Sequence, residues 1–329
     1  MLRRQFTHHA LKLATVASLA PVATIAHAQA FPSKPITILV AFAAGGPADT
    51  MSRVVGQQVS AALGQPVVVD NRPGGSGFIA AQMVAQAPPD GHTLLLSNIS
   101  MLSINPHTFT KLPYDAEKSF KHVIGFLGAS LVLAVNASVP AANLKEFIAW
   151  AKAQTAPVSY ASFTAGNASH FAGVIFNQRT GLNLVHVPFN GTPPAVQNLV
   201  GGQVQAAFLP LLAVKPHVES GKVRLLAVSS PQRSALVPDL ATFTEQGFPE
   251  LEIYIWSGLS APAGTPDAVV NKLNAEFSRI LRSAEIRDKW RAMDFEAIPG
   301  TPEEFLRLIQ ADSKRWQEAV RVSGFKASE

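Results

Sequence analysis

The sequence predicts an α/β protein with two lobes and a ligand cleft between them. Three observations support this fold class: short apolar runs alternate with amphipathic segments, glycine-bearing loops separate the two, and the pattern occurs twice along the chain. A strand that helices cover on both faces is a nearly unbroken apolar run, so the alternation indicates a mostly parallel sheet. In such sheets ligands bind beyond the carboxyl ends of the strands.

The first unit has strand–helix–strand–helix–strand order, and each helix follows a glycine-containing loop. Its expected strands cover residues 36–42, 67–69 and 93–97. Its expected helices run from about Thr50 to Leu63, where Gly64 ends the helix, and from the glycine turn at 74–77 through Ala85.

The second unit repeats this order, and helices follow it. Its expected strands cover residues 131–135, 158–161, 185–187, 205–208 and 224–228. Its expected helices cover 144–153, with Asn143 as the N-cap, 169–180, with Asn167 or Ser169 as the N-cap, and 195–200. Two further amphipathic helices are expected at 266–282 and 302–322, each with a proline just inside its start.

Composition excludes several classes of protein. The 329 residues are 47% hydrophobic and 15% charged, which is not the composition of a disordered chain. The absence of cysteine excludes a disulfide framework, a thiolate nucleophile and cysteine-ligated metal. Residues 1–28 carry three of the basic residues and no acidic one, so the formal charge of +5 falls to +2 without them. No basic stripe remains, and we expect no nucleic-acid partner.

Residues 1–28 are typical of a secretory signal peptide. A basic start precedes an apolar stretch, and Ala26-His27-Ala28 fits the A-x-A cleavage pattern. We therefore expect a mature chain that begins at Gln29 and is soluble in the periplasm. The Arg3-Arg4 pair leaves the Sec and twin-arginine export routes both open.

Motifs for catalysis and metal binding are missing from the sequence. No P-loop, H-E-x-x-H or G-x-S-x-G pattern occurs, and the histidines beyond residue 28 form no i,i+4 pair that would hold a metal. No set of nucleophile, base and orienting group can be assembled, which disfavours a hydrolase. We expect no enzyme activity, no catalytic residue, no cofactor and no metal site.

Four polar loops follow predicted strands, and together they predict a ligand cleft. The segment 42–49 is the strongest, because glycines let the backbone approach a ligand and the first N–H groups of a helix favour an anion. Asp49 is placed to cap the helix that follows. The other loops are 97–100, 164–170 and 187–192. Each loop alone is equally consistent with an ordinary capped helix start.

Short motifs along the whole mature length carry a resemblance to a known family. They are FPSKPI at 31–36, GGPAD at 45–49, VDNRPGGSG at 69–77, DGHTLL at 90–95, INP at 104–106, LVHVPFNG at 184–191, GGQV at 201–204, AVSS at 227–230 and APAGTP at 261–266. By these motifs the chain resembles the Bug family of extracytoplasmic solute-binding proteins, the receptors associated with tripartite tricarboxylate transporters. Each motif is weak alone, and the set is specific.

The resemblance implies a two-lobed periplasmic-binding-protein (type II-like) fold that closes on a small carboxylate. It implies that backbone amides and ordered waters hold the anion. The positions concerned are Phe42, Ala43, Ala44, Gly45, Gly46, Ala48, Asp49, Ser97, Asn98, Ser100, Gly166, Asn167, Ser169, His170, Asn190 and Gly191. The family usually has prolines where Ala43 and Ala44 stand, and a Tyr-Lys pair at Phe189-Asn190. The second departure removes a cation and a phenol, so a relative's ligand cannot be assigned to this chain.

We expect residues 29–130 with 252–329 to form lobe 1 and residues 131–251 to form lobe 2, with hinges near 125–131 and 250–258. The expected function is that of a monomeric periplasmic receptor. It captures a small organic acid for the membrane subunits of a tripartite tricarboxylate-type transporter. The alternative is a ligand-sensing receptor that presents its closed form to a membrane sensor kinase.

Overall fold

The framework of the molecule is a mixed β-sheet to which the described residues contribute ten strands. Eight of them follow the order β2-β1-β3-β9-β4-β7-β5-β6, and β8 and β10 both pair with β4. The strands are β1 (Ile36–Val40), β2 (Val67–Asn71), β3 (Thr93–Asn98), β4 (Phe120–Asn136), β5 (Ser159–Ser162), β6 (Val185–Pro188), β7 (Ala206–Pro210), β8 (Val223–Val228), β9 (Tyr254–Pro262) and β10 (Phe295–Ala297).

The computed structural model describes residues 31–42, 44–189 and 191–327. The predicted signal peptide, Ala43 and Asn190 lie outside the described residues. From Pro32 onward the chain forms one compact unit.

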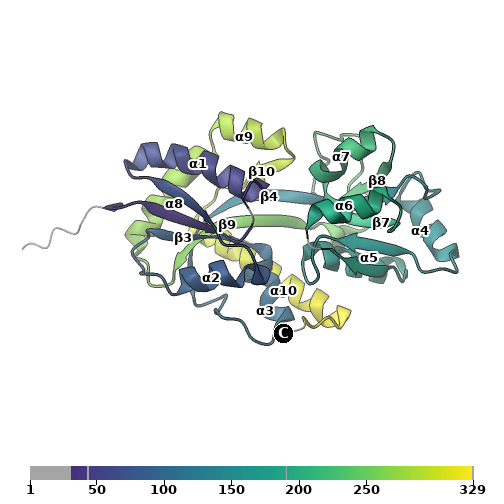
Figure 1. Ribbon diagram of the computed structural model, residues 1–329, viewed down its shortest axis with the longest axis horizontal. Coiled ribbons are helices and arrows are strands. Elements are labelled where there is room, and N and C mark those ends of the chain that lie inside the picture. Colours follow the sequence, from purple (N-terminus) through teal and green to yellow (C-terminus); the bar gives the residue numbers. More distant parts are fainter. Residues whose placement is uncertain (1–30, 43, 190, 328–329) are drawn as a thin grey trace, which may run out of the picture. The chain divides into compact units, whose positions relative to one another are not determined.

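Helices cover both faces of the sheet, as the alternating pattern predicts (Figure 1). They are α1 (Pro47–Leu63), α2 (Phe78–Ala85), α3 (Asn105–Thr108), α4 (Leu144–Ala153), α5 (Ala168–Thr180), α6 (Thr192–Val200), α7 (Leu211–Glu219), α8 (Asp267–Leu281), α9 (Ala284–Arg291) and α10 (Pro302–Ser323). Single turns occur at Gly75–Gly77, at Ser100–Ile104 (a π-helical turn) and at Pro249–Leu251. Among the described residues, no helix combines the length and hydrophobicity needed to cross a membrane.

The strands of the first α/β unit are parallel, as predicted, whereas in the second unit β5, β6 and β7 are parallel but β4 pairs antiparallel with β7 and β8. β1 pairs in parallel with β2 and β3, and β5 pairs in parallel with β6 and β7. The carboxyl ends of β1 and β5 lead into the loops before α1 and α5. The loops expected to bind a ligand therefore leave the sheet at strand ends in both halves.

The 17-residue strand β4 belongs to both halves of the sheet. Residues 120–130 pair with β9, whereas from Leu131 onward β4 pairs with β7 and β8. Figure 1 shows β4 and β9 running between the group around α1, α2 and α8 and the group formed by α4 to α7. The predicted strand at 131–135 is only the end of β4, because Gly125, Gly128 and polar residues break the apolar pattern of its first part.

Most helix ends lie close to the predicted ones. Asn143 caps α4 through its side chain, and Gly64 ends α1 in the left-handed conformation. Asn167, rather than Ser169, is the N-cap of α5. Pro266 is the N-cap of α8 rather than a residue inside it. The pattern also missed α7 and α9, so the C-terminal helices number three among the described residues, not two.

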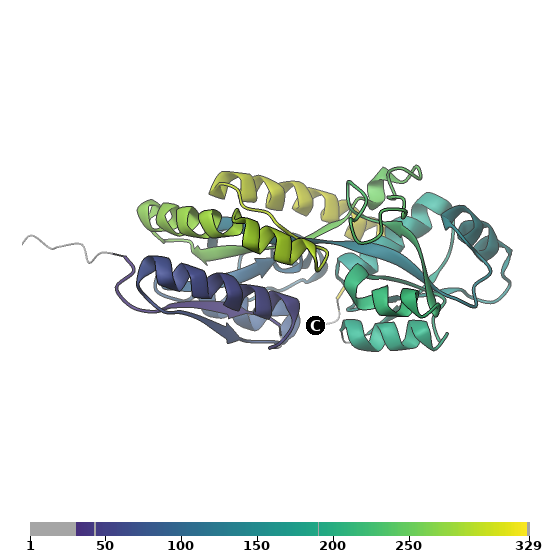
Figure 2. The ribbon, with the colours of Figure 1, turned by 90° about the horizontal axis from the view of Figure 1, so that it is seen from above.

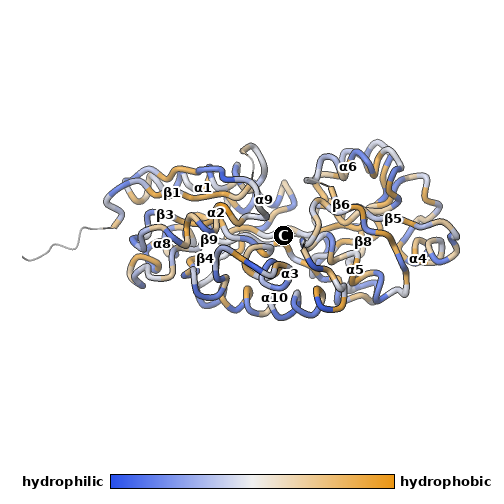
Figure 3. The backbone as a smooth tube through the Cα atoms, turned by 60° about the horizontal axis from the view of Figure 1, so that its bottom comes forward, coloured by the Kyte–Doolittle hydropathy of each residue, from blue (hydrophilic) through white to orange (hydrophobic). Residues whose placement is uncertain are grey.

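The core is apolar on both sides of the sheet. In Figure 3 hydrophobic residues follow the strands, while α10 alternates between hydrophobic and hydrophilic residues, as a helix with one buried side does. Phe305, Ile309 and Trp316 form the buried side of α10. This helix packs against the turn at 100–104, α3 and β4, and also against α5, so it contacts both halves of the molecule.

Candidate functional site

The loop before α1 is held in place by an ionic and hydrogen-bonded network. Asp49 Oδ2 accepts the Gly45 N–H at 2.9 Å, and an Arg53 guanidinium nitrogen lies 2.9 Å from Asp49 Oδ1. The N–H bonds of that nitrogen point to Asn71 Oδ1 (2.9 Å) and to the carbonyl of β2, so its contact with Asp49 is an ion pair rather than an aligned hydrogen bond. Asn71 Nδ2 in turn donates to the Phe42 carbonyl at 3.0 Å.

The prediction that Asp49 caps α1 is wrong. The helix begins at Pro47, three residues before the expected start, and Gly46 is an N-cap without a side-chain bond. Proline at the first helical position, where an N–H is dispensable, moves the start upstream. Asp49 thus lies in the first turn, where its carboxylate reaches back to Gly45. Burial raises the pKa of this carboxyl, but Arg53, the Gly45 N–H and Asn71 outweigh burial and hold the pKa below its usual value.

Two helix starts offer unpaired backbone donors. The first helical bond of α1 joins the Thr50 N–H to Gly46, and within the described residues no group accepts the N–H of Ala48 or Asp49. The start of α5 offers two more such groups, on Ala168 and Ser169, under the same restriction to the described residues. Each helix start adds roughly half a positive charge to these donors, which suits a carboxylate.

The loop after β3 uses its side chains to hold the backbone. Ser97 is fully buried, and its hydroxyl donates to the Gly258 carbonyl at 2.8 Å and contacts Ser260 at 3.0 Å. Asn98 Oδ1 accepts the Met101 N–H at 3.0 Å. These two polar groups are therefore occupied inside the protein. Whether Ser97, Asn98 or Ser100 touches a ligand stays a prediction.

The loop before α5 is fixed in the same way. Asn167 Oδ1 accepts the His170 N–H at 3.0 Å, and His170 Nδ1 accepts the Gly166 N–H at 3.1 Å. The buried Ser169 hydroxyl donates to the Phe208 carbonyl. Because His170 Nδ1 is an acceptor, the ring is neutral and carries its proton on Nε2. The expected side-chain donors thus position the loop, while among the described residues the N–H groups of Ala168 and Ser169 stay unpaired.

The structure also brings together two histidines that the sequence pattern treated as unrelated. The rings of His170 and His186 are stacked, with centroids 3.8 Å apart and planes 10° apart. His186 Nε2 contacts the Ser162 hydroxyl at 2.7 Å. Burial lowers the pKa of His170 to about 4; burial and the neighbouring ring lower that of His186 to about 3. Both imidazoles are therefore neutral at neutral pH.

The loop before α6 offers fewer donors. The Gly191 N–H is bonded to the Phe163 carbonyl, and Pro193 and Pro194, in the first turn of α6, have no N–H. Thr192 is therefore the residue of this first turn that brings an N–H. Asn190 lies outside the described residues, so its predicted role is untested.

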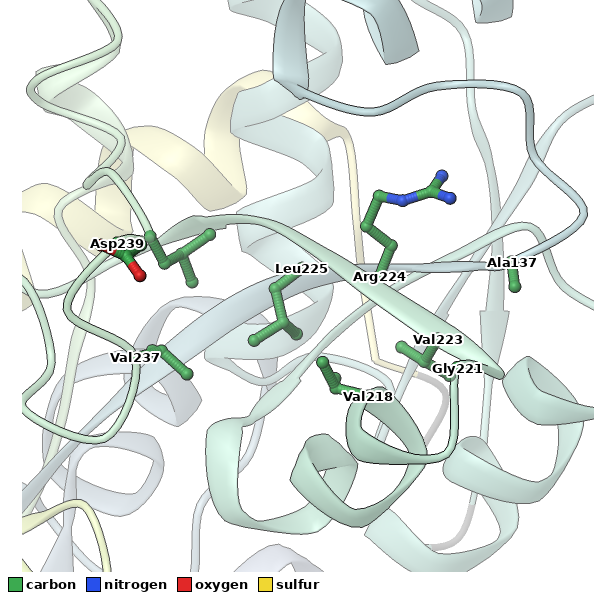
Figure 4. Close-up of a pocket in the computed structure, with 9 residues that line it drawn as sticks. Ala137, Val218, Gly221, Val223, Arg224, Leu225, Val237 and Asp239 are labelled. Atoms are coloured by element: carbon green, nitrogen blue, oxygen red, sulfur yellow. The ribbon is translucent and has the colours of Figure 1, made fainter.

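One open hollow lies away from all four loops, and a second lies next to the loop before α1. The first, of about 460 Å³, is lined mainly by aliphatic side chains of α7, β8 and the segment after it. Figure 4 shows Val218, Leu225 and Val237 around this hollow, while the Arg224 guanidinium points away from them; it donates to the carbonyls of Val139 and Ala141. The second, of about 390 Å³, lies between α1 and β2. The cation that lines the second hollow, Arg53, is already paired with Asp49.

The predicted loops contain no cationic side chain, and Arg53, which lies beside them, is already paired. In the part of the chain that the structure describes, no cluster of three or more His, Asp or Glu residues could hold a metal ion. An anion at these loops would therefore be bound by neutral backbone donors and helix dipoles.

Comparison with known proteins identifies the family. A family model described as TctC, the tripartite tricarboxylate transporter family receptor, matches residues 51–325. The chain belongs to this family. The chain is also similar to the protein BugT of Bordetella pertussis, to which it is 33% identical over 315 residues, 95% of each chain. The Bug-type resemblance of the sequence motifs is thereby confirmed.

Solved structures of the TctC type share the fold. The R. palustris protein Rpa4515 with adipate is 30% identical, with a TM-score of 0.81 over 90% of this chain and 99% of that one. MatC (Rpa3494) from Rhodopseudomonas palustris with bound malate is 33% identical, with a TM-score of 0.76 over 88% of this chain and 100% of that one. The predicted two-lobed α/β fold is confirmed.

Sequence reasoning missed three residues that shape the site. Arg53 could have been found, because it stands four residues after Asp49 on a predicted helix. His186 could not, since only the parallel pairing of β5 with β6 brings it to the α5 loop. Phe325 lies 155 residues after His170, and no local pattern predicts that their rings touch.

Proposed function

We propose that this chain is a periplasmic receptor that captures a small carboxylate and delivers it to the membrane subunits of a tripartite tricarboxylate-type transporter. The family assignment supports a receptor for such a transporter. The relatives with adipate and malate support a carboxylate as the ligand class. Export follows from the signal peptide that the sequence predicts.

One observation carries the proposal for the ligand: the starts of α1 and α5, one in each half of the sheet, both present N–H groups that have no partner among the described residues. Donors on two sides suit an acid with two polar ends. Pairing with Arg53 neutralises the buried charge of Asp49, which otherwise disfavours an anion beside it. We propose as ligand contacts the same loops that the sequence predicts, Phe42–Asp49, Ser97–Ser100, Gly166–His170 and Asn190–Gly191.

We further propose that the lobes are residues 29–130 with 252–329, and 131–251. The exchange of β4 partners between Ser130 and Leu131 supports the first boundary. At the second, the Ser229 hydroxyl donates to the Ile253 carbonyl and accepts the Leu131 N–H, so the two connecting segments lie together. Small backbone rotations in these segments would open and close the cleft.

Binding measurements test the proposal. Protein purified from the periplasm without refolding is examined by native mass spectrometry for a retained acid. Calorimetric titration then compares adipate and malate with adipamide, which has the shape of adipate but no charge. We expect a retained carboxylate or saturable binding of a dicarboxylate, and no binding of adipamide. Binding of adipamide as tight as that of adipate, or turnover of a bound acid, contradicts the proposal.

A further inference from the structure

The last described residues form a short segment that returns toward the ligand loops. We call Gly324–Ala327 the C-terminal strap. Gly324 ends α10 in the left-handed conformation, and the Phe325 N–H is bonded to the Ser323 hydroxyl at 3.0 Å. At the other end, the Ala327 N–H donates to the carbonyl of Thr108 in α3 at 3.1 Å. Figure 1 shows the yellow end of α10 beside α3 and below α5.

The strap places one aromatic ring directly on the α5 loop. The Phe325 ring meets the His170 ring edge to face, with centroids 5.0 Å apart and planes 77° apart, and the Phe171 ring at 5.8 Å. Gly166 lies under the same ring: a Cβ built there would stand 2.9 Å from Phe325 Cε1. Gly166 also has a φ of 72°, which favours glycine. The loop before α5 and the C-terminal strap therefore have complementary shapes.

The strap itself is anchored on the opposite half of the molecule. In α10 the Ile309 carbonyl accepts the Ser103 hydroxyl at 3.1 Å, and Ser313 contacts His107 at 2.9 Å. Both partners lie in the segment between β3 and β4, on the β1–β3 side of the sheet. Phe325 thus reaches from one half of the molecule to the ligand loop of the other. Figure 2 shows the yellow segment after α10 reaching toward the elements of the other half.

The hold on the loop depends on a neutral His170, because a protonated Nδ1 cannot accept the Gly166 N–H. The elements packed on this ring bring few titratable groups. β6 contributes His186, and β5 contributes the Tyr160 hydroxyl, which donates to the His170 carbonyl at 2.9 Å. The strap contributes Phe325, and its Lys326 is exposed. Exclusion of water is the cause of the lowered pKa of His170, and Phe325 covers one side of the ring.

We propose that Phe325 is a positioning residue for ligand binding. From the C-terminal strap it seals His170 against water, which keeps the Gly166 N–H bonded to Nδ1 and presents the Ala168 and Ser169 N–H groups. The binding part of this inference rests on the proposed function. The seal on His170 does not, and it can be measured without any ligand.

The first experiment is an NMR pH titration of the histidine ring signals in ligand-free protein. We compare wild type with Phe325→Ala and with Val322→Ala, a matched control at an exposed position of the last helical turn. We expect the pKa of His170 to rise by at least two units in Phe325→Ala and to stay near 4 in wild type and Val322→Ala. An unchanged His170 pKa in folded Phe325→Ala overturns the proposal.

The second experiment measures the Kd for adipate and malate at pH 7 and pH 5.5. Adipate and malate themselves change ionisation between these pH values, but this affects every variant equally and cancels when each Kd is divided by the wild-type Kd. We expect Phe325→Ala to raise the Kd about tenfold at pH 7 and several-fold more at pH 5.5. We expect Phe325→Tyr, which keeps the aromatic ring, to have a Kd within threefold of wild type. A Kd of Phe325→Ala that lies within twofold of the wild-type Kd at both pH values contradicts the positioning role. Tighter binding by Phe325→Ala at pH 5.5 than at pH 7, relative to wild type, also contradicts it, because the protonated His170 ring would then bind the anion directly. If wild type binds neither acid, the proposed function fails, and the His170 titration still decides the seal.

Discussion

Replacing Arg53 tests the claim that the site binds an anion beside a neutralised carboxylate. Arg53→Met leaves the buried Asp49 charge without its partner and removes the link to Asn71 and thus to the Phe42 carbonyl. Breaking a buried ion pair costs about 3–5 kcal/mol, but the Arg53 side chain is 50% exposed, so we expect about 1–2 kcal/mol. This lowers Tm by roughly 3–6 °C.

The effect on affinity follows from the position of Asp49 in the first turn of α1. A carboxylate bound at the helix start would lie about one turn away, roughly 5–6 Å from the Asp49 carboxyl. At an effective dielectric constant near 20 the repulsion is about 3 kcal/mol, and solvent access reduces it to about half. The Kd for a dicarboxylate should therefore rise about tenfold.

The assay is calorimetric titration of a set of variants with adipate and malate. Asp49→Asn alone should change the Kd less than tenfold, and Asp49→Asn with Arg53→Met should return it to within threefold of wild type. Arg72→Met is the control, because Arg72 forms a similar but exposed pair with Asp70. The reasoning is refuted if Arg53→Met binds as tightly as wild type, or if the double variant is as weak as Arg53→Met.

Three further predictions concern stability. Burial lowers the pKa of His122 and His170 to about 4 and that of His186 to about 3, below the unfolded value near 6.5. The contribution of these neutral rings to the free energy of unfolding is complete above pH 6.5. It is lost as pH falls toward 4, at up to about 1.4 kcal/mol per pH unit for each ring. Urea unfolding between pH 4 and 7 that shows no such loss would exclude buried neutral rings. A Cβ at Gly128 would lie 2.0 Å from the Tyr254 ring, so Gly128→Ala should destabilise the protein by about 1–3 kcal/mol. Adding Tyr254→Leu to this variant should partly restore stability. Equal stability of Gly128→Ala and wild type contradicts this packing. Asn143→Ala should cost about 1 kcal/mol through loss of the α4 cap, and Asn143→Ser, which keeps an oxygen acceptor without adding a charge beside Glu146, should cost clearly less; an equal drop in Tm for both, or no drop for either, argues against the cap.

Local chemistry made much of the fold predictable. Asn143 and Gly64 specify helix ends through groups within four residues of them, so their roles follow from the sequence. The apolar runs of β1 and β3 similarly identify buried strands. The first part of β4 was missed because its glycines serve tertiary contacts: Gly128 makes room for the Tyr254 ring of β9. Such a requirement is invisible in a local pattern.

The site was predictable as a set of loops but not as a set of contacts. Polar residues at strand ends marked Asn98 and Ser169, yet both use their side chains to hold the backbone. The prediction of Asp49 as a cap is wrong because Pro47 moves the start of α1 upstream and places Asp49 in the first turn. The His170–His186 stack and the Phe325 contact arise from chain segments that only folding brings together.

The central claim is that backbone N–H groups at the starts of α1 and α5 hold the ligand. The most direct test follows the backbone amide signals by NMR during titration with a dicarboxylate that binds. We expect the largest downfield shifts, and slowed hydrogen exchange, at Ala48, Asp49, Ala168 and Ser169. Shifts confined to the hollow around Val218 and Leu225, with these four amides unchanged, would contradict the account.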